Sequence, residues 1–249
     1  MRRLYINWKK VFIITTDVVL AVYLVLAVTS WNNPDRSEQR CTKVNISVED
    51  GETDGFLSAK EVKRFLTNKE IYPLHQYTND VDVREIQDVL IKSPFIEKAS
   101  CYKTENGNVN ISISQRTPII RIKSDNGADY YVDNKGGVMP KTNYSTNLIV
   151  ATGNISSTFA RKVLGNLANY IVHDDFWRNQ VVQINVLADH SIELVPRVGD
   201  HIIYIGQATD IESKLDRMYK FYKYGLSQAG WNKYKYISVE FANQIICKK

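Results

Sequence analysis

The stretch DGETDGFLSAKE, residues 50–61, has the spacing of side-chain oxygens that a calcium site requires. In a twelve-residue EF-hand loop, oxygen ligands occupy positions 1, 3, 5, 9 and 12, and a glycine at position 6 allows a sharp turn. The stretch has glycine at position 6, and its ligand positions hold Asp50, Glu52, Asp54, Ser58 and Glu61. Calcium binding is therefore the first chemistry that the sequence allows.

An ordinary turn followed by a helix cap explains the same residues. Ser58 and Glu61 have the spacing of a capping box, in which the serine accepts from the backbone and the glutamate reaches back. Position 3 holds Glu52, where a shorter Asp or Asn is usual. The preceding segment KVNISVE alternates like a strand and does not supply the incoming helix. We therefore favour the turn and cap over a metal site, and we expect no cofactor.

The other residues that could do chemistry are too scattered for a recognisable active site. The chain has no HExxH or GxSxG motif and no glycine loop for phosphate. Asp174 and Asp175 would point in different directions on a helix, and Asp133 is placed to form a turn. The four histidines are His75, His173, His190 and His201. The sequence predicts a non-catalytic protein; a membrane-tethered exported enzyme and a calcium-stabilised binding module are the alternatives.

The elements that position these residues begin with an apolar stretch, Val11 to Trp31. It contains one charge, Asp17, and as a helix it would be about 30 Å long, which is enough to cross a bilayer. Residues 1–10, MRRLYINWKK, carry four basic residues and no acid. The positive-inside rule therefore predicts a cytoplasmic N-terminus, with residues 32–249 across the membrane. A cleaved signal peptide is the alternative, and the length of the run favours an anchor.

Charge and cysteine content limit which classes of partner and ligand the sequence favours. Most of the net charge of +5 lies in the first ten residues, so the exported part is nearly balanced. It has no basic stripe with interleaved aromatic residues, and nucleic acid is therefore not expected as a partner. The cysteines Cys41, Cys101 and Cys247 are widely spaced and lack the paired spacing of metal ligands. The sequence is compatible with one disulfide bond and also with three free thiols.

Residues 43–122 read as strand, helix, helix, strand and strand, after a linker at 32–42. KVNISVE is the first strand, and SAKEVKRFL and DVREIQDVLIKS are helices opened by Ser58 and Asp82. IEKASCYKTENGNVNISISQR follows as two strands around an Asn-Gly turn. We expect the strand near Ile96 to Tyr102 to be an edge of its sheet.

Residues 123–249 read as a second, mixed α/β domain with a mostly antiparallel sheet. Strands are expected in ADYYVDNKGGVMP, NLIVATG and VVQINVLADHSIELVPRVGDHIIYIG, and one more strand at the C-terminus. Helices are expected in STFARKVLGNLANYI and in DIESKLDRMYKFYKYGL, the latter opened by a capping box from Thr209 to Glu212. The predicted fold class is α+β, with one N-terminal transmembrane helix.

This layout resembles the FtsQ/DivIB family of bacterial cell-division proteins, in which the βααββ part is a POTRA domain. The phrases FLSAKEV, SPFIEKASCYKTENGNVNISISQRTPIIRI, YYVDNKGGVMP and YKYISVEFANQIICKK carry the resemblance by their order and spacing. The resemblance implies a non-catalytic, single-pass inner-membrane scaffold of the divisome, with the bulk of the chain in the periplasm. It also implies FtsB-like and FtsL-like small membrane proteins as partners, and further divisome proteins at the POTRA-like domain.

The resemblance places the FtsB-binding strand in the closing segment KYKYISVEF. Its alternation predicts one apolar, core-facing side and one side able to meet a partner strand at the sheet edge. A closing strand whose tyrosines only cover the sheet is the alternative. The candidate partner-binding residues are Trp231, Tyr234, Tyr236, Ile237, Ser238, Val239, Glu240 and Phe241.

Overall fold

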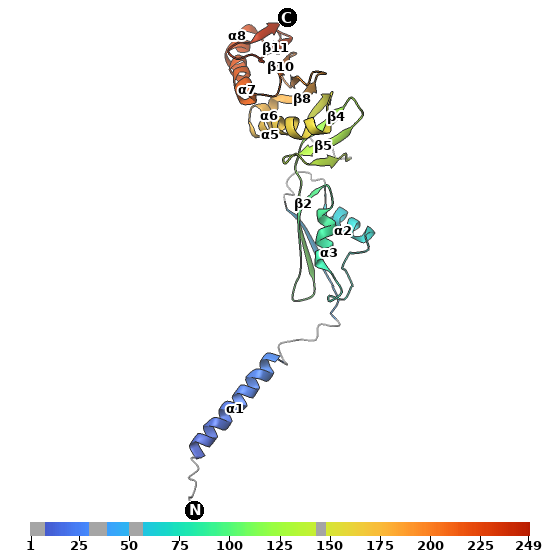
Figure 1. The fold of residues 1–249 in the computed structure, drawn as a ribbon, viewed down its shortest axis with the longest axis vertical. Helices are drawn as coiled ribbons and strands as arrows, with labels where there is room; N and C mark the ends of the chain where they lie inside the picture. Colours follow the sequence, from blue (N-terminus) through green and yellow to red (C-terminus); the bar gives the residue numbers. More distant parts are fainter. Residues whose placement is uncertain (1–7, 30–38, 50–56, 143–147) are drawn as a thin grey trace, which may run out of the picture.

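The computed structural model of the chain describes residues 8–29, 39–49, 57–142 and 148–249 (Figure 1). Helix α1, Trp8–Thr29, stands apart at the N-terminal end and exposes its apolar side chains. Its segment Trp8–Val28 is long and apolar enough to cross a membrane. The helix begins three residues before the predicted start at Val11, and residues 30 and 31 lie outside the described chain.

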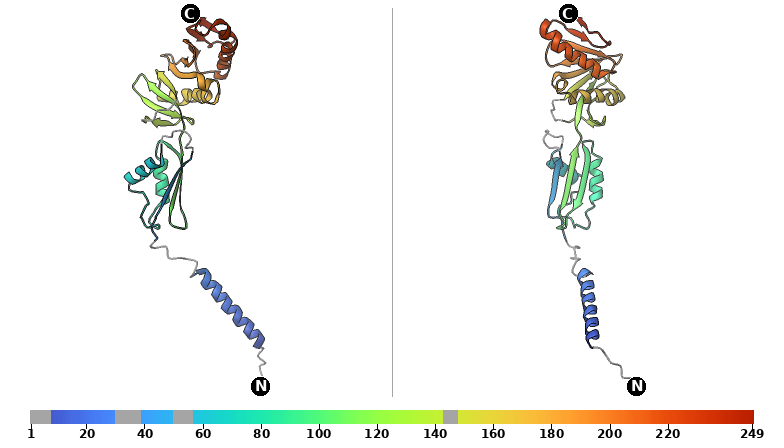
Figure 2. Two further views of the ribbon diagram at one scale, coloured as in Figure 1. Left: turned by 180° about the vertical axis from the view of Figure 1, so that it is seen from behind. Right: turned by 90° about the vertical axis from the view of Figure 1, so that its left-hand side faces the viewer.

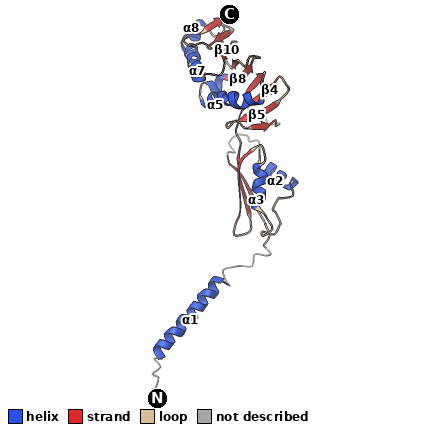
Figure 3. Cartoon of the chain, viewed as in Figure 1, coloured by secondary structure: helices blue, strands red, loops and turns tan. Residues whose placement is uncertain are grey.

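A three-stranded sheet with two helices on one face follows, and it confirms the predicted βααββ order (Figure 3). The strands lie in the order β1, β3, β2, so β2 is an edge as predicted. β1 runs parallel to β3, and β2 runs antiparallel to it. The elements are β1 (Val44–Glu49), α2 (Ala59–Asn68), α3 (Val83–Ile91), β2 (Ile96–Lys103) and β3 (Val109–Gln115).

Local sequence fixes where the two helices of this domain begin. Ser58 caps α2 in a reciprocal capping box with Glu61, and Asp82 caps α3 by accepting from the backbone nitrogens of Arg84 and Glu85. Each satisfied N–H is a donor that the helix itself cannot pair. The apolar stripes of both helices then pack on the sheet, and the buried core includes Val62, Leu66, Ile86, Leu90, Val109, Ile111 and Ile113.

The second domain is built on a nine-stranded sheet in the order β12-β11-β10-β9-β8-β7-β4-β5-β6. Five of its neighbouring pairs are antiparallel, and β4–β7, β7–β8 and β10–β11 are parallel. The strands are β4 (Pro118–Ser124), β5 (Asp129–Asp133), β6 (Val138–Pro140), β7 (Ile149–Gly153), β8 (Val181–Val186), β9 (Ile192–Pro196), β10 (Ile202–Gly206), β11 (Tyr236–Ser238) and β12 (Ile246–Lys248).

Helical segments cover one face of this sheet (Figure 2). Ile184, Leu194 and Ile203 are buried beneath them, whereas the alternate residues Glu193 and Tyr204 are half-exposed on the other face. This is the period-2 alternation of a sheet with one solvated side. The segments are α4 (Ser157–Phe159), η1 (Ala160–Leu164), α5 (Gly165–His173), α6 (Trp177–Gln180), α7 (Ile211–Lys220), η2 (Phe221–Leu226) and α8 (Ser227–Ala229).

The boundary between the two domains lies at Arg116 and Thr117, and the predicted boundary after residue 122 is wrong. β4 begins at Pro118 and belongs to the nine-stranded sheet. No linker separates β3 from β4. The alternating apolar pattern therefore continues through the point at which the chain passes from one sheet to the other, and the sequence does not mark the boundary. Arg116 N donates to the carbonyl of Phe95 at 3.0 Å on one side of this point.

A small core joins the two domains. Tyr131 and Met139 of the second domain are buried, and Phe95 of the first domain packs against them. Lys135 forms an ion pair with Glu97 across the same junction. The contact therefore has an apolar centre and a charged rim.

The predicted capping box at the start of α7 is wrong. The helix begins at Ile211, and Asp210 occupies the cap position in the left-handed conformation, with φ of 52° and no side-chain cap. Thr209 lies one residue too early to cap this helix, and its N–H donates to the Gln207 carbonyl at 2.8 Å. The helix nevertheless has an inward apolar stripe, because Leu215, Met218 and Tyr222 are buried.

Candidate partner-binding edge

Most of the possible calcium loop cannot be placed, because Asp50, Glu52 and Asp54 lie outside the described residues. Glu61 is described, and it serves as the capping residue of α2: its Oε2 accepts from Ser58 N at 2.8 Å and from Ser58 Oγ at 3.0 Å. The predicted helix cap is thus confirmed. Among the residues that the structure describes, no three His, Cys, Asp or Glu side chains gather to hold a metal ion.

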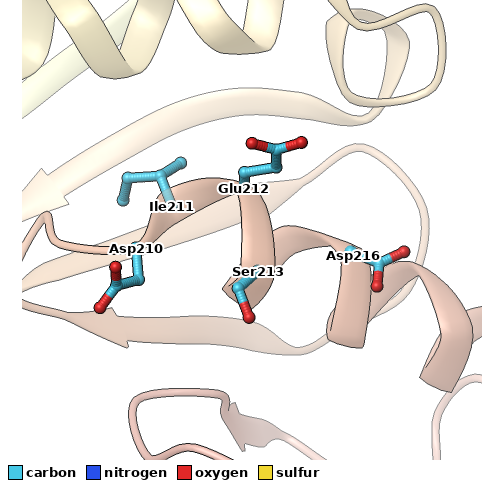
Figure 4. Close-up of a pocket in the computed structure, with 5 residues that line it drawn as sticks. All are labelled: Asp210, Ile211, Glu212, Ser213 and Asp216. Atoms are coloured by element: carbon cyan, nitrogen blue, oxygen red, sulfur yellow. The ribbon is translucent and has the colours of Figure 1, made fainter.

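An acidic hollow lies at the start of α7 (Figure 4). It is lined by Asp210, Ile211, Glu212, Ser213 and Asp216, all from one short segment. The carboxylates of Asp210 and Glu212 point to opposite sides of the helix. Paired acid and base work needs carboxyl groups that converge on one reacting centre, and these do not.

The C-terminal segment forms two strands where the sequence predicted one. β11 pairs in parallel with β10 on one side and antiparallel with β12 on the other, so β12 is the edge of the nine-stranded sheet. The prediction that KYKYISVEF is the edge strand is therefore wrong. Between the strands the chain reverses, and Asn243 adopts a φ of 63°, a conformation that Asn tolerates better than most residues.

Because β11 is an inner strand, most of the eight predicted partner-binding residues contact the domain itself. Ile237, Ser238 and Val239 are buried, and Phe241, expected on the core side, is 50% exposed because β11 ends at Ser238. Trp231 is 37% exposed and packs on Tyr222 with ring centroids 5.0 Å apart.

The three remaining predicted residues also lie inside the domain's own contacts. Tyr234 packs against the core beside Phe221. Glu240 lies against Gly206, where an added Cβ would meet its side chain at 2.9 Å. Tyr236 packs against Tyr204 and lies beside Glu193.

Tyr236 belongs to a connected group on the half-exposed face of the sheet. Its ring stacks on Tyr204 with centroids 5.8 Å apart, and Lys248 lies 5.3 Å from the ring centre. Burial, and then the neighbouring carboxylate of Glu193, raise the pKa of Tyr236 to about 12. The phenol therefore stays protonated and donates a hydrogen bond to Glu193, which fixes β11 against β9.

The backbone pattern shows which groups the outer edge leaves open. Val239 N donates to the Tyr204 carbonyl at 2.9 Å, and Ile202 N donates to the Lys235 carbonyl at 2.9 Å, so these backbone groups on the two residues that flank β11 face β10. By alternation, Ser238 faces β12, where it lies opposite Ile246. The same alternation turns the N–H and C=O of Cys247 toward the free edge.

Sequence reasoning missed β12 itself. Ile246 is 41% exposed, and Cys247 contributes a half-buried side chain to the core. Three residues are too few for a period-2 signal, so only the apolar pair in QIICKK pointed to a strand. Burial raises the pKa of Cys247, which disfavours the reactive thiolate form.

Helix α7 holds the end of β11 in place. Arg217 Nη2 donates to the Val239 carbonyl at 2.8 Å, and Lys214 Nζ donates to the carbonyls of Ile205 and Gln207 at 2.9 and 2.8 Å. Two buried or half-buried cations thus satisfy carbonyls where β10 and β11 end. These side chains of α7 hold the ends of β10 and β11, and β11 in turn pairs with the edge strand β12.

Comparison with known families agrees with the two domains. The family model described as a POTRA-like domain matches residues 39–114. The model described as FtsQ/DivIB, C-terminal related, matches residues 117–248, which is more than half of the chain. The two matches meet where the chain passes from the small sheet to the large one. A comparison with curated proteins found no match. The chain belongs to the FtsQ/DivIB family.

Proposed function

We propose that this protein is a non-catalytic scaffold of the bacterial divisome that binds FtsB-like and FtsL-like membrane proteins. Membership of the FtsQ/DivIB family implies a role in cell division. The observation that carries the more specific proposal is the edge strand β12, whose outward backbone groups are free to pair with an extended partner segment. Each added hydrogen bond would contribute roughly 0.5–1.5 kcal/mol net.

The partner strand would lie along Cys247 and contact the exposed side chains next to it. Ile246 and Phe241 are 41% and 50% exposed, and large apolar side chains at this level of exposure are what an interface core covers. Trp231 lies in the loop that leads to β11 and offers a further aromatic anchor. The proposed site is therefore the β12 edge with these three side chains, and no longer β11.

A proline at position 247 tests the proposal. Cys247→Pro removes the thiol and one outward N–H, whereas Cys247→Ala also removes the thiol but keeps that N–H. The full-length chain, co-expressed with the FtsB-like protein of the same organism, should lose at least tenfold in co-purified partner for the proline variant only. Equal capture by both variants, with both folded, would reject strand addition at β12.

The proposal includes one membrane span with a cytoplasmic N-terminus. The support is helix α1 together with the basic residues on its N-terminal side. We expect the intact chain to stay in the membrane after carbonate washing. A reporter enzyme active only outside the cytoplasm should work when fused at the C-terminus and fail when fused at the N-terminus. A soluble product that begins near Trp31 would show a cleaved signal peptide instead.

We also propose that the POTRA-like domain meets other divisome proteins. Its edge strand β2 carries Glu97, Lys98 and Lys103 and a register shift between Ile96 and Lys98, features that protect an edge as often as they serve a partner. Deletion of residues 41–116 should abolish recruitment to the septum while β12 still captures the FtsB-like protein. Normal septal recruitment of this variant would contradict a recruiting role for the domain.

A further inference from the structure

The free edge of β1 differs from the other three sheet edges that the structure describes. β2 is interrupted by a register shift and carries lysines. β6 and β12 span three residues each, and β6 ends in Pro140. β1 instead pairs with β3 over six residues in unbroken register, with no proline or lysine inside the strand. Proteins usually protect edges with short strands, bulges, prolines or lysines, and within the part of the chain that the structure describes the edge of β1 has none of these.

β1 and β3 contain the same tetrapeptide, Val-Asn-Ile-Ser, and the two copies lie side by side in parallel register. Asn45 Nδ2 donates to Asn110 Oδ1 at 2.8 Å. Ser47 Oγ lies 3.3 Å from Ser112 Oγ in a second hydrogen bond. Identical side chains therefore form hydrogen-bonded rows across parallel strands, an arrangement that a further strand can repeat.

The pairing with β3 shows which backbone groups of β1 are left open. Val109 N donates to the Lys43 carbonyl at 3.1 Å. Because successive residues turn their backbone groups to opposite edges, those of Lys43 and of every second residue after it face β3. The N–H and C=O groups of Val44, Ile46 and Val48 therefore face the free edge, and the side chains of these three residues are only half-buried.

We propose that the free edge of β1 binds an extended segment of a partner protein, which adds as a fourth, parallel strand. Its sequence alternates β-branched apolar residues with Asn, Ser or Thr. The short polar side chains continue the rows begun by Asn45 and Ser47, and the apolar ones cover Val44, Ile46 and Val48. This inference stands independently of the proposed site at β12.

A second copy of this chain does not offer such a strand. To repeat the register that β1 adopts on β3, the incoming strand must present the edge that carries the backbone groups of its own Asn45 and Ser47. In a folded copy that edge is already paired with β3. The occupant must therefore be a segment whose backbone is free before binding, as in other cases of strand addition.

A peptide of residues 43–49, KVNISVE, is the probe for this edge. In parallel register its asparagine N–H points toward β1 and its isoleucine N–H points away. Fluorescence anisotropy with the full chain in nanodiscs should show binding that N-methylation at the asparagine weakens at least tenfold and N-methylation at the isoleucine leaves unchanged. The reverse pattern would indicate an antiparallel strand. That pattern, equal binding of a scrambled peptide, or no binding up to about 1 mM would each overturn the proposal.

Variants of the protein provide a second test of the proposed binding at β1. Ile46→Ala trims the covered side chain and keeps the outward N–H, whereas Ile46→Pro also removes that N–H, so the proline variant should bind the KVNISVE peptide at least tenfold more weakly than the alanine variant. The peptide experiment decides the question if the proline variant does not fold. Light scattering supplies a further criterion: if Ile46→Pro halves the mass of the folded full chain, the edge joins two copies and the proposal is overturned.

Discussion

His201 Nε2 lies 2.7 Å from the hydroxyl of Tyr222, and both side chains are 2% exposed. This pair connects the start of β10 to the π-helical turn η2. Trp231 covers Tyr222 from the loop that leads into β11. His201 Nδ1 is buried and has no hydrogen-bond partner among the described residues. The pair is therefore a buried structural contact, and burial disfavours the charged form of His201.

We expect the protein to lose stability as the pH falls below about 6.5. Burial lowers the pKa of His201, while the adjacent Asp200 raises it by a smaller amount. The unfolded chain takes up the proton near the ordinary pKa of about 6.5 and the folded chain only at lower pH, so the free energy of unfolding falls over this interval. The slope is at most about 1.4 kcal/mol per pH unit.

Urea denaturation of the full chain in detergent at several pH values measures this slope. His201→Asn removes the titrating group and should flatten the profile between the lowered pKa of His201 and about pH 6.5. An unchanged profile in that variant would assign the slope to other groups. His173→Asn is the control, because this histidine ends helix α5 and is exposed.

Gly153→Ala should prevent stable folding. Gly153 has a φ of 104°, and an added Cβ would lie 2.1 Å from the Val186 carbonyl oxygen, which is backbone and cannot move aside. Gly127 has a φ of 85° and nothing within 4 Å, so Gly127→Ala carries only the conformational strain of roughly 1–2 kcal/mol. Thermal unfolding of both variants separates the effect of the clash from that of the strain. A similar loss of stability in both variants would refute the predicted clash at position 153.

Arg217→Met should loosen the C-terminal edge. The change removes the donor to the Val239 carbonyl, and a buried acceptor left unpaired costs about 1–3 kcal/mol. Hydrogen exchange should become faster in β11 and β12 and stay unchanged in β4. Lys220→Met on the same helix removes an equal charge from an exposed pair with Asp216 and should have no such effect. Equal exchange in both variants would exclude a positioning role for Arg217.

Met139→Ala should weaken the joint between the two domains. Met139 is fully buried beside Tyr131, with Phe95 packed against them from the first domain, and such a truncation costs about 2–5 kcal/mol. Small-angle scattering of the full chain should then show a broader range of domain orientations. Val138→Ala, which trims an exposed neighbour on the same strand, is the control. Unchanged scattering in Met139→Ala would mean that Met139 is not needed for the joint, which the contact of Phe95 with Tyr131 and the ion pair of Lys135 and Glu97 then hold.

Features set by a few neighbouring residues could be predicted from the sequence. The caps at Ser58 and Asp82 and the hairpin between β2 and β3 are local, and the structure confirms all three. The turn at Asp133 is local as well: its Oδ1 accepts from the backbone nitrogens of Lys135 and Gly137 at 2.9 and 2.6 Å.

Long-range pairing could not be predicted in the same way. That β11 joins β10 in parallel, and that β12 folds back over it, depends on contacts between Tyr236 and Ile202 and between Tyr236 and Lys248. No period in the sequence encodes such partners. A single pairing decides which strand has a free edge. For this reason the candidate site lies on β12 and not on β11, where the sequence had predicted it.

The order of the parts also sets a length requirement for partners. β12 lies at the end of the second domain that is farthest from the POTRA-like sheet (Figure 1), and the junction around Met139 keeps the two domains in contact. A partner that is anchored in the same membrane and binds β12, as proposed above, would have to project past the whole POTRA-like domain before its first residue can pair. On that proposal, a segment too short to span the POTRA-like domain would not reach the strand, however well its sequence suited it.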